Sequence, residues 1–507
     1  MSAIRTKQAL SNTAVSIISK CVLMLAPFLM RMVMIKKLGV EYLGLNSLFS
    51  SLLTMLSLSE LGFSNAIIFA MYKPMAEGNN AEVCALLNFY KKIYRIIGTA
   101  ITVLGVAFIP FIDIFAGSDY PENINIYVVY LIYLLNTVLS YFLFAYQNSL
   151  LIAGMRTDLD TIITTGCRVA MFAAQIILLL VIPDYYIYVL CLPLFTIINN
   201  ILKMLLVRNK YPQYISSGEI STEKRKDIMI RVGALASGKI GGVIYASLDS
   251  IIIPAFLGLS LLGKYSNYQW IYTSAYGFAE VAFASMQAII GNSMVCKEKD
   301  DNRRIFNLLF VISVWITMLF TSCMICLYQP FIKLWVGEEN QLPFIIPLLL
   351  TASFFVRSMK CVCHIFKEAA GLWNKEILKP YISSAVNICL AIILIKLIGL
   401  PGATIALLIS LAFVETPWET HIFFKYYFKS SPLKYYLSLF KLIISTLIAA
   451  GTSYFICTKM PDSIIGFGLR VIICLIVPSL FYFLIYCRTD EFKDLIKRAK
   501  LILNRNK

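Results

Sequence analysis

The stretch IFNLLFVISVWITMLFTSCMICLY (305–328) contains no charged residue and is long enough to cross a bilayer as one helix. Similar runs recur from one end of the chain to the other; 59% of the 507 residues are hydrophobic and 14% are charged. This composition excludes a soluble or disordered protein, and continuous helix-length runs exclude a β-barrel, whose strands alternate apolar and polar residues. The sequence therefore predicts an all-α integral membrane protein.

The apolar runs predict fourteen transmembrane helices. They lie near residues 12–35, 44–70, 96–115, 124–148, 161–182, 186–207, 232–256, 265–293, 305–328, 344–366, 380–398, 402–424, 438–457 and 464–487. With the N-terminus inside, 30 of the 45 Lys and Arg fall in cytoplasmic segments and 5 in outside loops, so both termini are predicted to be cytoplasmic. The net charge of +17 then follows mostly from topology and requires no nucleic-acid partner.

The chain repeats itself at an offset of about 219 residues. The segment LGVEYLG (38–44) aligns without a gap on LGLSLLG (257–263), and Lys20 aligns on Lys239 at the same offset. Duplication predicts two six-helix lobes related by a parallel repeat around a central cavity, followed by a C-terminal helix pair. Such bundles are typical of alternating-access transporters, although a duplication can also build a scaffold.

The repeat and the charge pattern predict five parts of the chain. Residues 1–207 form the N-lobe (helices 1–6), 208–231 a cytoplasmic inter-lobe loop, 232–424 the C-lobe (helices 7–12), 425–487 helices 13 and 14, and 488–507 a cytoplasmic amphipathic tail.

Basic side chains inside a span cost on the order of 3 kcal/mol to insert, so those that remain are expected to face protein or water. Lys20 and Arg31 are spaced to share one face of the first helix, and Lys239 has the matching depth on the seventh. These three residues are candidates for binding an anionic substrate. Arg31 lies near the outer end and could instead extend to the interface.

Acidic side chains accompany these cations. Asp249 follows Lys239 toward the outer side, and Glu60 and Glu280 lie on the second helix of each lobe, near the depth of the two aligned lysines. A Lys–Glu pair in each lobe could couple transport to an ion or simply hold helices together. The sequence leaves both roles open.

The tenth span carries the densest group of polar residues. Arg357, Lys360, His364 and Glu368 recur at three- and four-residue intervals and so lie on one helical stripe. We expect Arg357 and Lys360 to bind substrate, and His364 and Glu368 to serve ion coupling or charge pairing. The alternative is a salt-bridge ladder within this helix.

Each candidate enzyme motif in the sequence lacks a feature that its chemistry requires. GALASGKI (233–240) resembles part of a phosphate-binding loop but has Ile240 where Ser or Thr must hold magnesium, and no strand precedes it. Cys361, Cys363 and His364 lack a second ligand pair, so no metal site is predicted there. We expect the protein not to be an enzyme.

Two further groups are expected to be structural. The thirteen cysteines lie almost wholly in apolar runs, as Cys323 and Cys326 do, where cysteine behaves as a small hydrophobe. Glu415, Glu419 and His421 cluster near the inner end of the twelfth span, where a position at the interface is the simpler explanation.

Three stretches carry a resemblance to a known family: LGVEYLGLNSLFSSLLTMLSLSELGFSNAI (38–67), AAGLWNKE (369–376) followed by Asn387, and GLPGATIALLIS (399–410). With them in this order, the whole chain resembles the polysaccharide transporters, the Wzx-type lipid-linked oligosaccharide flippases of the multidrug/oligosaccharidyl-lipid/polysaccharide (MOP) exporter superfamily. The resemblance implies fourteen helices in two lobes, and export of an undecaprenyl-pyrophosphate-linked glycan across the bacterial inner or only membrane.

Related flippases hold the pyrophosphate with cations on the first and seventh helices, and the matching positions are Lys20, Arg31 and Lys239. A cavity lined by these cations should attract a lipid pyrophosphate and repel an organic cation. The alternatives are a peptidoglycan-precursor lipid flippase and a MATE-like cation-coupled small-molecule exporter. A membrane glycan polymerase is disfavoured by the duplication and by outside loops too short for a catalytic domain.

The resemblance also implies the partners of the protein. We expect it to bind the undecaprenyl-pyrophosphate-linked oligosaccharide and membrane lipids, and to work with a glycan polymerase and glycosyltransferases of the same pathway. We expect a monomer in the bacterial plasma membrane, with no nucleic-acid partner and no cofactor other than a coupling ion, H⁺ or Na⁺.

Overall fold

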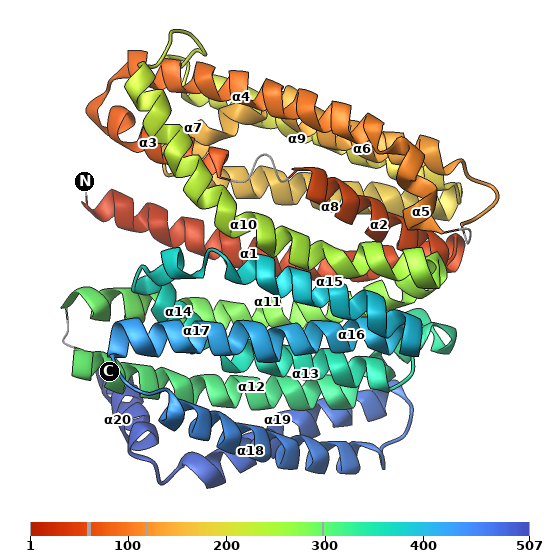
Figure 1. The fold of residues 1–507 in the computed structure, drawn as a ribbon, viewed down its shortest axis with the longest axis vertical. Coiled ribbons are helices and arrows are strands. Elements are labelled where there is room, and N and C mark those ends of the chain that lie inside the picture. The colour runs from red at the N-terminus through yellow and green to blue at the C-terminus, as the bar shows by residue number, and fades with distance from the viewer. Residues whose placement is uncertain (1, 58–61, 118–119, 297–298, 506–507) are drawn as a thin grey trace. The chain divides into compact units, whose positions relative to one another are not determined.

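The computed structural model describes residues 2–57, 62–117, 120–296 and 299–505, and every regular element in these ranges is helical (Figure 1). Within the same ranges, ten helices are long and apolar enough to cross a membrane, or up to twelve if each of two bent pairs is one span. The chain is therefore an all-α, multi-pass membrane protein, as the sequence predicted. It divides into two compact units, residues 1–263 (unit 1) and 264–507 (unit 2).

Unit 1 contains ten α-helices among its described residues. They are α1 (Ser2–Lys37), α2 (Val40–Leu56), α3 (Phe63–Glu77), α4 (Asn80–Ala107), α5 (Ile112–Ala116), α6 (Ile126–Phe142), α7 (Asn148–Ala153), α8 (Thr157–Val181), α9 (Tyr185–Lys210) and α10 (Thr222–Leu257). Short polar side chains cap several of them: Asp184 accepts a hydrogen bond from the backbone N–H of Ile187 at 3.1 Å, where α9 begins. The chain bends by 44° between α4 and α5 and by 47° between α6 and α7.

The helices of unit 1 pack in neighbouring pairs. α6 lies beside both α4 and α9, and α1 packs along α8 (Figure 1). α10, which corresponds to the seventh predicted span, packs on α2, α3 and α5 of the same unit. Hydrogen bonds between polar side chains connect α2 to this bundle, as Tyr133 Oη donates to Asn46 Oδ1 at 2.8 Å.

The two aligned segments of the repeat have matching backbone geometry. Gly39 joins α1 to α2 with φ of +124°, and Gly258 joins α10 to α11 (Leu259–Cys296) with φ of +83°. Both values lie in a region that favours glycine because a side chain would clash there. The shared conformation supports a duplication.

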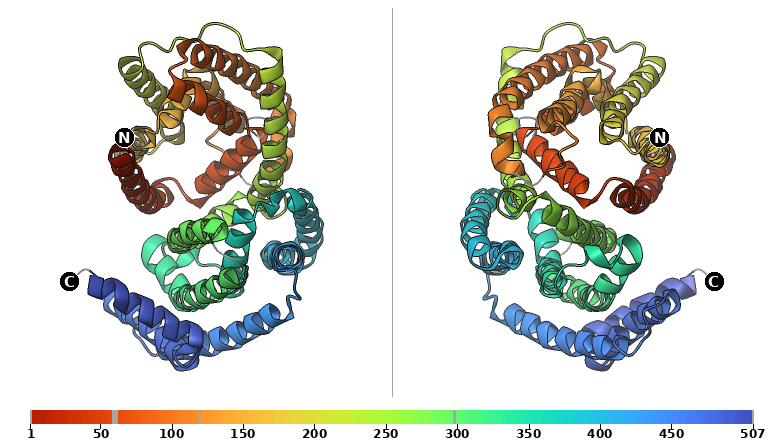
Figure 2. Two further views of the ribbon diagram at one scale, coloured as in Figure 1. Left: turned by 90° about the vertical axis from the view of Figure 1, so that its left-hand side faces the viewer. Right: turned by 90° about the vertical axis from the view of Figure 1, so that its right-hand side faces the viewer.

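Unit 2 begins within α11 and contains nine further α-helices among its described residues. They are α12 (Lys299–Val336), α13 (Ile345–Met359), α14 (Cys361–Ala369), α15 (Lys379–Ile398), α16 (Leu400–Ile409), α17 (Thr416–Ile422), α18 (Leu433–Cys457), α19 (Ile464–Tyr486) and α20 (Asp490–Arg505). α12 packs against α13, α18 and α19. Most of the helices from α11 to α17 are seen end on in Figure 2, so their axes are roughly parallel or antiparallel.

Two π-helical turns interrupt the segment that corresponds to the twelfth predicted span. They lie at Ser410–Glu415 and Phe423–Phe428, on either side of α17. A π-turn inserts one residue into the helical repeat and so rotates the side chains that follow it; such turns often occur at functional sites. Here the first π-turn ends on an acidic residue, Glu415, that belongs to the network described below.

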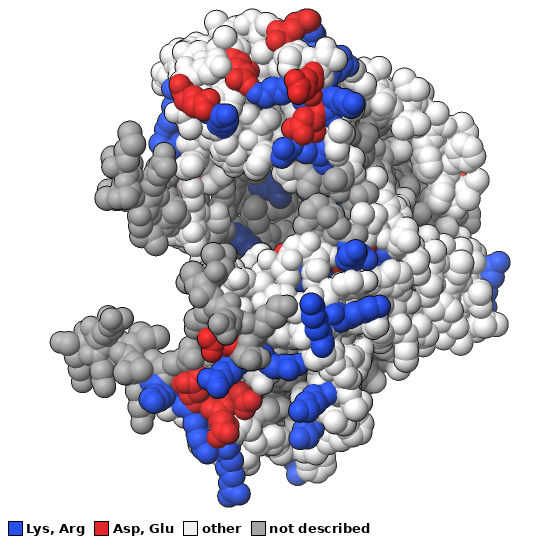
Figure 3. Space-filling view, turned by 60° about the vertical axis from the view of Figure 1, so that its left-hand side comes forward, with Lys and Arg blue, Asp and Glu red and all other residues white. Residues whose placement is uncertain are grey.

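Charged side chains gather in patches that mix both signs, while wide areas of the same face carry none (Figure 3). In unit 1, ion pairs join segments that the sequence places in the cytoplasm: Lys92 Nζ lies 3.1 Å from a Glu219 carboxylate oxygen, and Lys224 pairs with Glu82. Uncharged areas of this extent suit contact with lipid.

The predicted topology can be tested by cysteine labelling. Ser217 is exposed in the predicted cytoplasmic loop, and Thr458 is exposed in a predicted outside loop. A membrane-impermeant thiol reagent added to intact cells should label Thr458→Cys above the background of the parent protein and should label Ser217→Cys only after permeabilisation. Labelling of Ser217→Cys in intact cells would reverse the predicted orientation.

Candidate functional site: a buried charge network in unit 2

Six charged side chains come together inside unit 2. Three lysines and three glutamates make up this charge network, and their side chains are between 1% and 17% exposed. They are Lys360, Lys367, Lys379, Glu376, Glu415 and Glu419. The charges balance, which is necessary because an unpaired charge at such depth is strongly disfavoured. His364 and Glu368 lie at the edge of the network and are 47% and 41% exposed.

One side of the network centres on Lys360, which lies at the junction of α13 and α14. Its Nζ donates to Glu415 Oε2 at 2.6 Å and lies 3.6 Å from Glu419 Oε1. Ser383 on α15 donates a hydrogen bond to the other Glu415 oxygen at 3.1 Å. Glu415 therefore has a partner for each of its carboxylate oxygens, and Lys360 is held between two acids.

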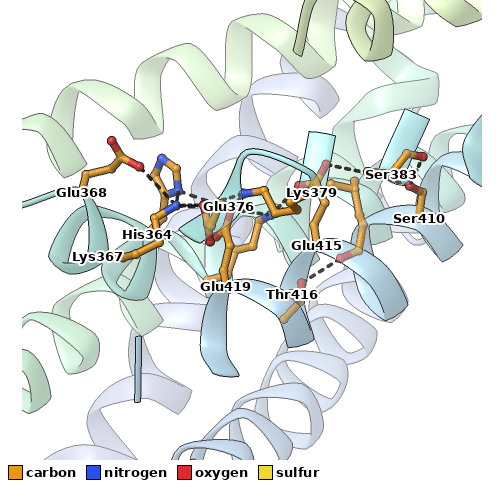
Figure 4. Close-up of polar contacts among 12 residues, drawn as sticks. His364, Lys367, Glu368, Glu376, Lys379, Ser383, Ser410, Glu415, Thr416 and Glu419 are labelled. Atoms are coloured by element: carbon orange, nitrogen blue, oxygen red, sulfur yellow. Dashed lines mark hydrogen bonds and ion pairs between the residues drawn. The ribbon is translucent and has the colours of Figure 1, made fainter. Parts of the chain in front are cut away.

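The other side centres on Glu419 of α17, whose side chain is 2% exposed. Its Oε1 accepts a hydrogen bond from Lys379, lies 3.4 Å from His364 Nδ1, and lies 4.0 Å from Lys367 Nζ. Figure 4 shows these side chains converging from α14, α15 and α17. One carboxylate thus joins three helical segments that are distant in sequence.

Glu376 completes the network from the turn Leu372–Glu376 between α14 and α15. It pairs with Lys367, and its Oε2 accepts from Lys379 at 3.1 Å. One oxygen of Glu376 and one of Glu419 are nevertheless buried without a hydrogen-bond partner in the described part of the chain. A buried carboxylate oxygen with spare accepting capacity can take up a proton, a water molecule or a cation.

Arg357 stands apart from this network, although it lies on the same predicted stripe. Its side chain is exposed, and its guanidinium carbon lies 3.9 Å from the centre of the Tyr276 ring, a cation–π contact with α11. Within the described ranges, no acidic side chain lies within ion-pair distance of Arg357. Arg357 therefore differs from Lys360, which is held between two acids.

The other predicted site residues are distributed over both units. Lys20 and Arg31 are partly exposed on α1, and Lys239 is exposed on α10. Among the predicted acids, Asp249 is partly exposed on α10, Glu280 is exposed on α11, and Glu60 lies outside the described residues.

The sequence identified part of the charge network and missed part of it. Lys360 and His364 pair with Glu415 and Glu419 on another segment, whereas Glu368 pairs with Lys367 on its own helix. Glu419, which was expected from the sequence to be structural, is buried in unit 2 as part of the network. Lys367, Glu376 and Lys379 were missed because they were placed in a cytoplasmic loop. The seven-residue spacing from Lys360 to Lys367, two turns of one helix face, was the available signal.

Sequence comparison connects the chain to one family. The model of a family described as "Polysaccharide biosynthesis protein" matches residues 9–290, more than half of the chain. No curated protein sequence matches the chain.

Comparison with solved structures identifies the fold. A lipid II flippase, MurJ, in an inward closed conformation matches with a TM-score of 0.70 at 16% identity, over 96% of this chain and 99% of the other. An inward-facing multidrug resistance MATE transporter of the MOP superfamily matches with a TM-score of 0.62 at 13% identity, over 78% and 93%. A Vibrio cholerae MATE transporter matches with a TM-score of 0.56 at 13% identity, over 84% and 98%. The chain therefore shares the fold of these flippase and transporter structures.

Proposed function

Because the chain belongs to the polysaccharide biosynthesis protein family, we propose that it is a flippase for an undecaprenyl-pyrophosphate-linked oligosaccharide. It moves a repeat unit of capsule, O-antigen or exopolysaccharide from the inner to the outer leaflet of the bacterial plasma membrane by alternating access. The family, the transporter fold and the cations retained in membrane-spanning helices support this function.

Arg357 is the observation that carries the proposal. It lies within the candidate span Ile345–Ala369, yet it is exposed and stacked on Tyr276 instead of paired with an acid. The guanidinium also hydrogen-bonds with Tyr272 and Tyr276, but it carries five N–H donors, so it keeps donors for a charge-assisted contact with a phosphate. Inserting a charged side chain into a membrane costs free energy, so a cation that remains in a span is expected to have a functional partner. An anionic lipid head group has the complementary charge.

Phosphate binding is also proposed for three other basic residues: Lys20 and Arg31 on α1, and Lys239 on α10. A pyrophosphate with about two negative charges gains from each added cation, whereas an organic cation is repelled by all of them. This charge pattern disfavours a cation exporter of the MATE type. Lys360 is not included among the phosphate-binding residues because Glu415 and Glu419 already hold it.

The charge network is proposed to serve ion coupling. A proton or Na⁺ bound at the spare oxygens of Glu376 or Glu419 would change the charge balance of the buried lysines. His364 contacts Glu419 and is exposed, so it offers a path for protons between the network and the outside of unit 2. Coupling through this network would let an ion gradient bias the packing of α14, α15 and α17.

The flippase function can be tested with Arg357→Ala and Lys239→Ala. Loss of one charge-assisted phosphate contact, worth roughly 1.5–3 kcal/mol, should weaken substrate binding by roughly ten- to a hundredfold. Transport of a lipid-linked oligosaccharide into proteoliposomes and complementation of a flippase-deficient strain should both fall accordingly, at unchanged membrane abundance. Arg357→Lys should keep part of the activity, because lysine binds phosphate as a point charge without the planar fork.

The matched control is Lys73→Ala, which removes an exposed cation from the end of α3 and should transport normally. Normal transport by both Arg357→Ala and Lys239→Ala would contradict phosphate binding by these cations. The same assay should offer a peptidoglycan precursor as competitor, since lipid II is the substrate in the printed name of one structural neighbour. If the protein prefers that precursor, its substrate is the peptidoglycan precursor and not the oligosaccharide.

A further inference from the structure

Four cysteines from three helices gather in unit 2, away from the charge network. Cys326 lies on α12, Cys457 ends α18, and Cys474 lies on α19; all three are buried, and their sulfur atoms lie within 4.8 Å of one another. Cys323, one turn before Cys326, packs against this group and its thiol donates to the Cys474 carbonyl at 4.0 Å. We refer to these four residues as the thiol cluster.

The arrangement of the thiol cluster is close to that of a metal site. Thiolates around Zn²⁺ at about 2.3 Å lie about 3.8 Å from one another in a tetrahedron, so a distance within 4.8 Å requires only small side-chain movements. Cys323 and Cys326 have the C-x-x-C spacing common in zinc sites, and the remaining two thiols come from other helices. Packing alone requires small apolar side chains and does not require three sulfur atoms within 4.8 Å of one another.

We propose that the thiol cluster binds one soft metal ion, Zn²⁺ or Cu⁺, through Cys326, Cys457 and Cys474, with Cys323 as the fourth ligand. Thiolate ligands select these ions over Mg²⁺ or Ca²⁺. Each coordinating thiol releases its proton to water as its sulfur binds the metal. The proposal is independent of the flippase function, since none of the four thiols belongs to the proposed phosphate-binding residues or to the charge network.

A positive charge lies beside the thiol cluster. Arg470 is 7% exposed, and its Nε donates to the carbonyl oxygen of Cys457 at 3.2 Å. Four thiolates and one Zn²⁺ carry a net charge of −2, which is costly in an apolar environment unless a cation lies nearby. Arg470 supplies such a cation one turn before Cys474 on the same helix.

A cavity lined by both polar and apolar side chains connects the thiol cluster to the surface. It has a volume of about 400 Å³, and its lining includes Cys326, Cys457, Lys333, Asp462 and Arg470. Asp462 is exposed at this cavity, and its hydrogen bond with Arg470 lowers the pKa of its carboxyl below the usual range. A charged carboxylate here can attract a metal cation, so the cavity provides an entry path to the sulfur atoms.

Metal content of the purified full-length protein tests this proposal. Protein in detergent is stripped with a chelator, loaded with ZnSO₄ or with Cu⁺ under reducing conditions, desalted and analysed by elemental mass spectrometry. Wild type should retain about one metal ion per chain, and Cys326→Ala combined with Cys474→Ala should lower this at least tenfold. Co²⁺ in place of Zn²⁺ should give the visible absorption bands of a tetrahedral thiolate site in wild type only.

Cys389→Ala is the matched control, because Cys389 is exposed on α15 and lies outside the thiol cluster. It should retain the metal of wild type. A second measurement needs no variant: added metal should raise the unfolding temperature of chelator-treated wild type. The proposal is overturned if wild type retains no metal, if the double variant retains as much as wild type, or if the purified cysteines form disulfides instead.

Discussion

Glu419→Ala is expected to destabilise unit 2 by about 3–5 kcal/mol, because it leaves buried lysines without a compensating charge. Glu419 contacts Lys360, Lys367 and Lys379, and its own side chain is 2% exposed. After the substitution, three buried lysines share two acids, Glu376 and Glu415. The apparent unfolding temperature in detergent, followed by the loss of monodisperse protein after heating, should fall by about 10 °C for a unit of this size.

Two further variants separate the effect of the Glu419 charge on stability from the effect of its side-chain shape. Glu419→Gln keeps the volume and one acceptor oxygen, so it should recover only part of the lost stability. Glu419→Gln combined with Lys379→Met restores the charge balance and should be more stable than Glu419→Gln alone, which a double-mutant cycle measures as coupling. Glu77→Ala, which breaks an exposed pair with Lys73, should change stability by less than about 0.5 kcal/mol. Equal effects of Glu419→Ala and Glu77→Ala would contradict a stabilising role for the network.

The helices were predictable because few backbone structures are stable in a membrane. A chain in lipid must satisfy its hydrogen bonds internally, so a continuous apolar run becomes a helix, as residues 161–182 do in α8. The breaks within two of the predicted spans could not be predicted from apolar runs. The predicted span 44–70 corresponds to α2 and α3, and the span 344–366 divides into α13 and α14 near Lys360. Each span is apolar enough overall to read as one helix, and the position of a helix break depends on packing that composition does not report.

The candidate sites show which contacts a single sequence can reveal. Periodicity placed Lys360 and His364 on one stripe, because both belong to the same stretch of helix. The acids that pair with them, Glu415 and Glu419, lie more than fifty residues away, and no spacing rule connects such segments. The thiol cluster is similar: the C-x-x-C spacing of Cys323 and Cys326 is visible in the sequence, whereas their approach to Cys457 and Cys474 depends on the packing of α12 with α18 and α19.

The repeat, in contrast, predicts a pair of equivalent residues at a close helix crossing. Gly44 and Gly263 align in the two copies, and each faces the backbone of the other copy in unit 1. A Cβ on Gly44 would lie 2.2 Å from the carbonyl oxygen of Leu259, and a Cβ on Gly263 would lie 2.0 Å from that of Val40. Val40 and Leu259 are themselves aligned, so the contact is nearly symmetric. Glycine is required at both positions because the opposing atoms belong to the backbone and cannot turn away.

Gly44→Ala and Gly263→Ala should therefore each destabilise unit 1 by about 3 kcal/mol, at the upper end of overpacking costs, because α2 and the start of α11 must move apart. The matched control is Gly166→Ala in the interior of α8, where an added Cβ meets nothing within 4 Å; alanine should be neutral or stabilising there. Unfolding temperatures of the three variants give the comparison. The double variant should lose less than the sum of the single variants, since the separation forced by one methyl group makes room for the other. Stability equal to that of Gly166→Ala in either single variant would show that the two segments do not cross at these glycines.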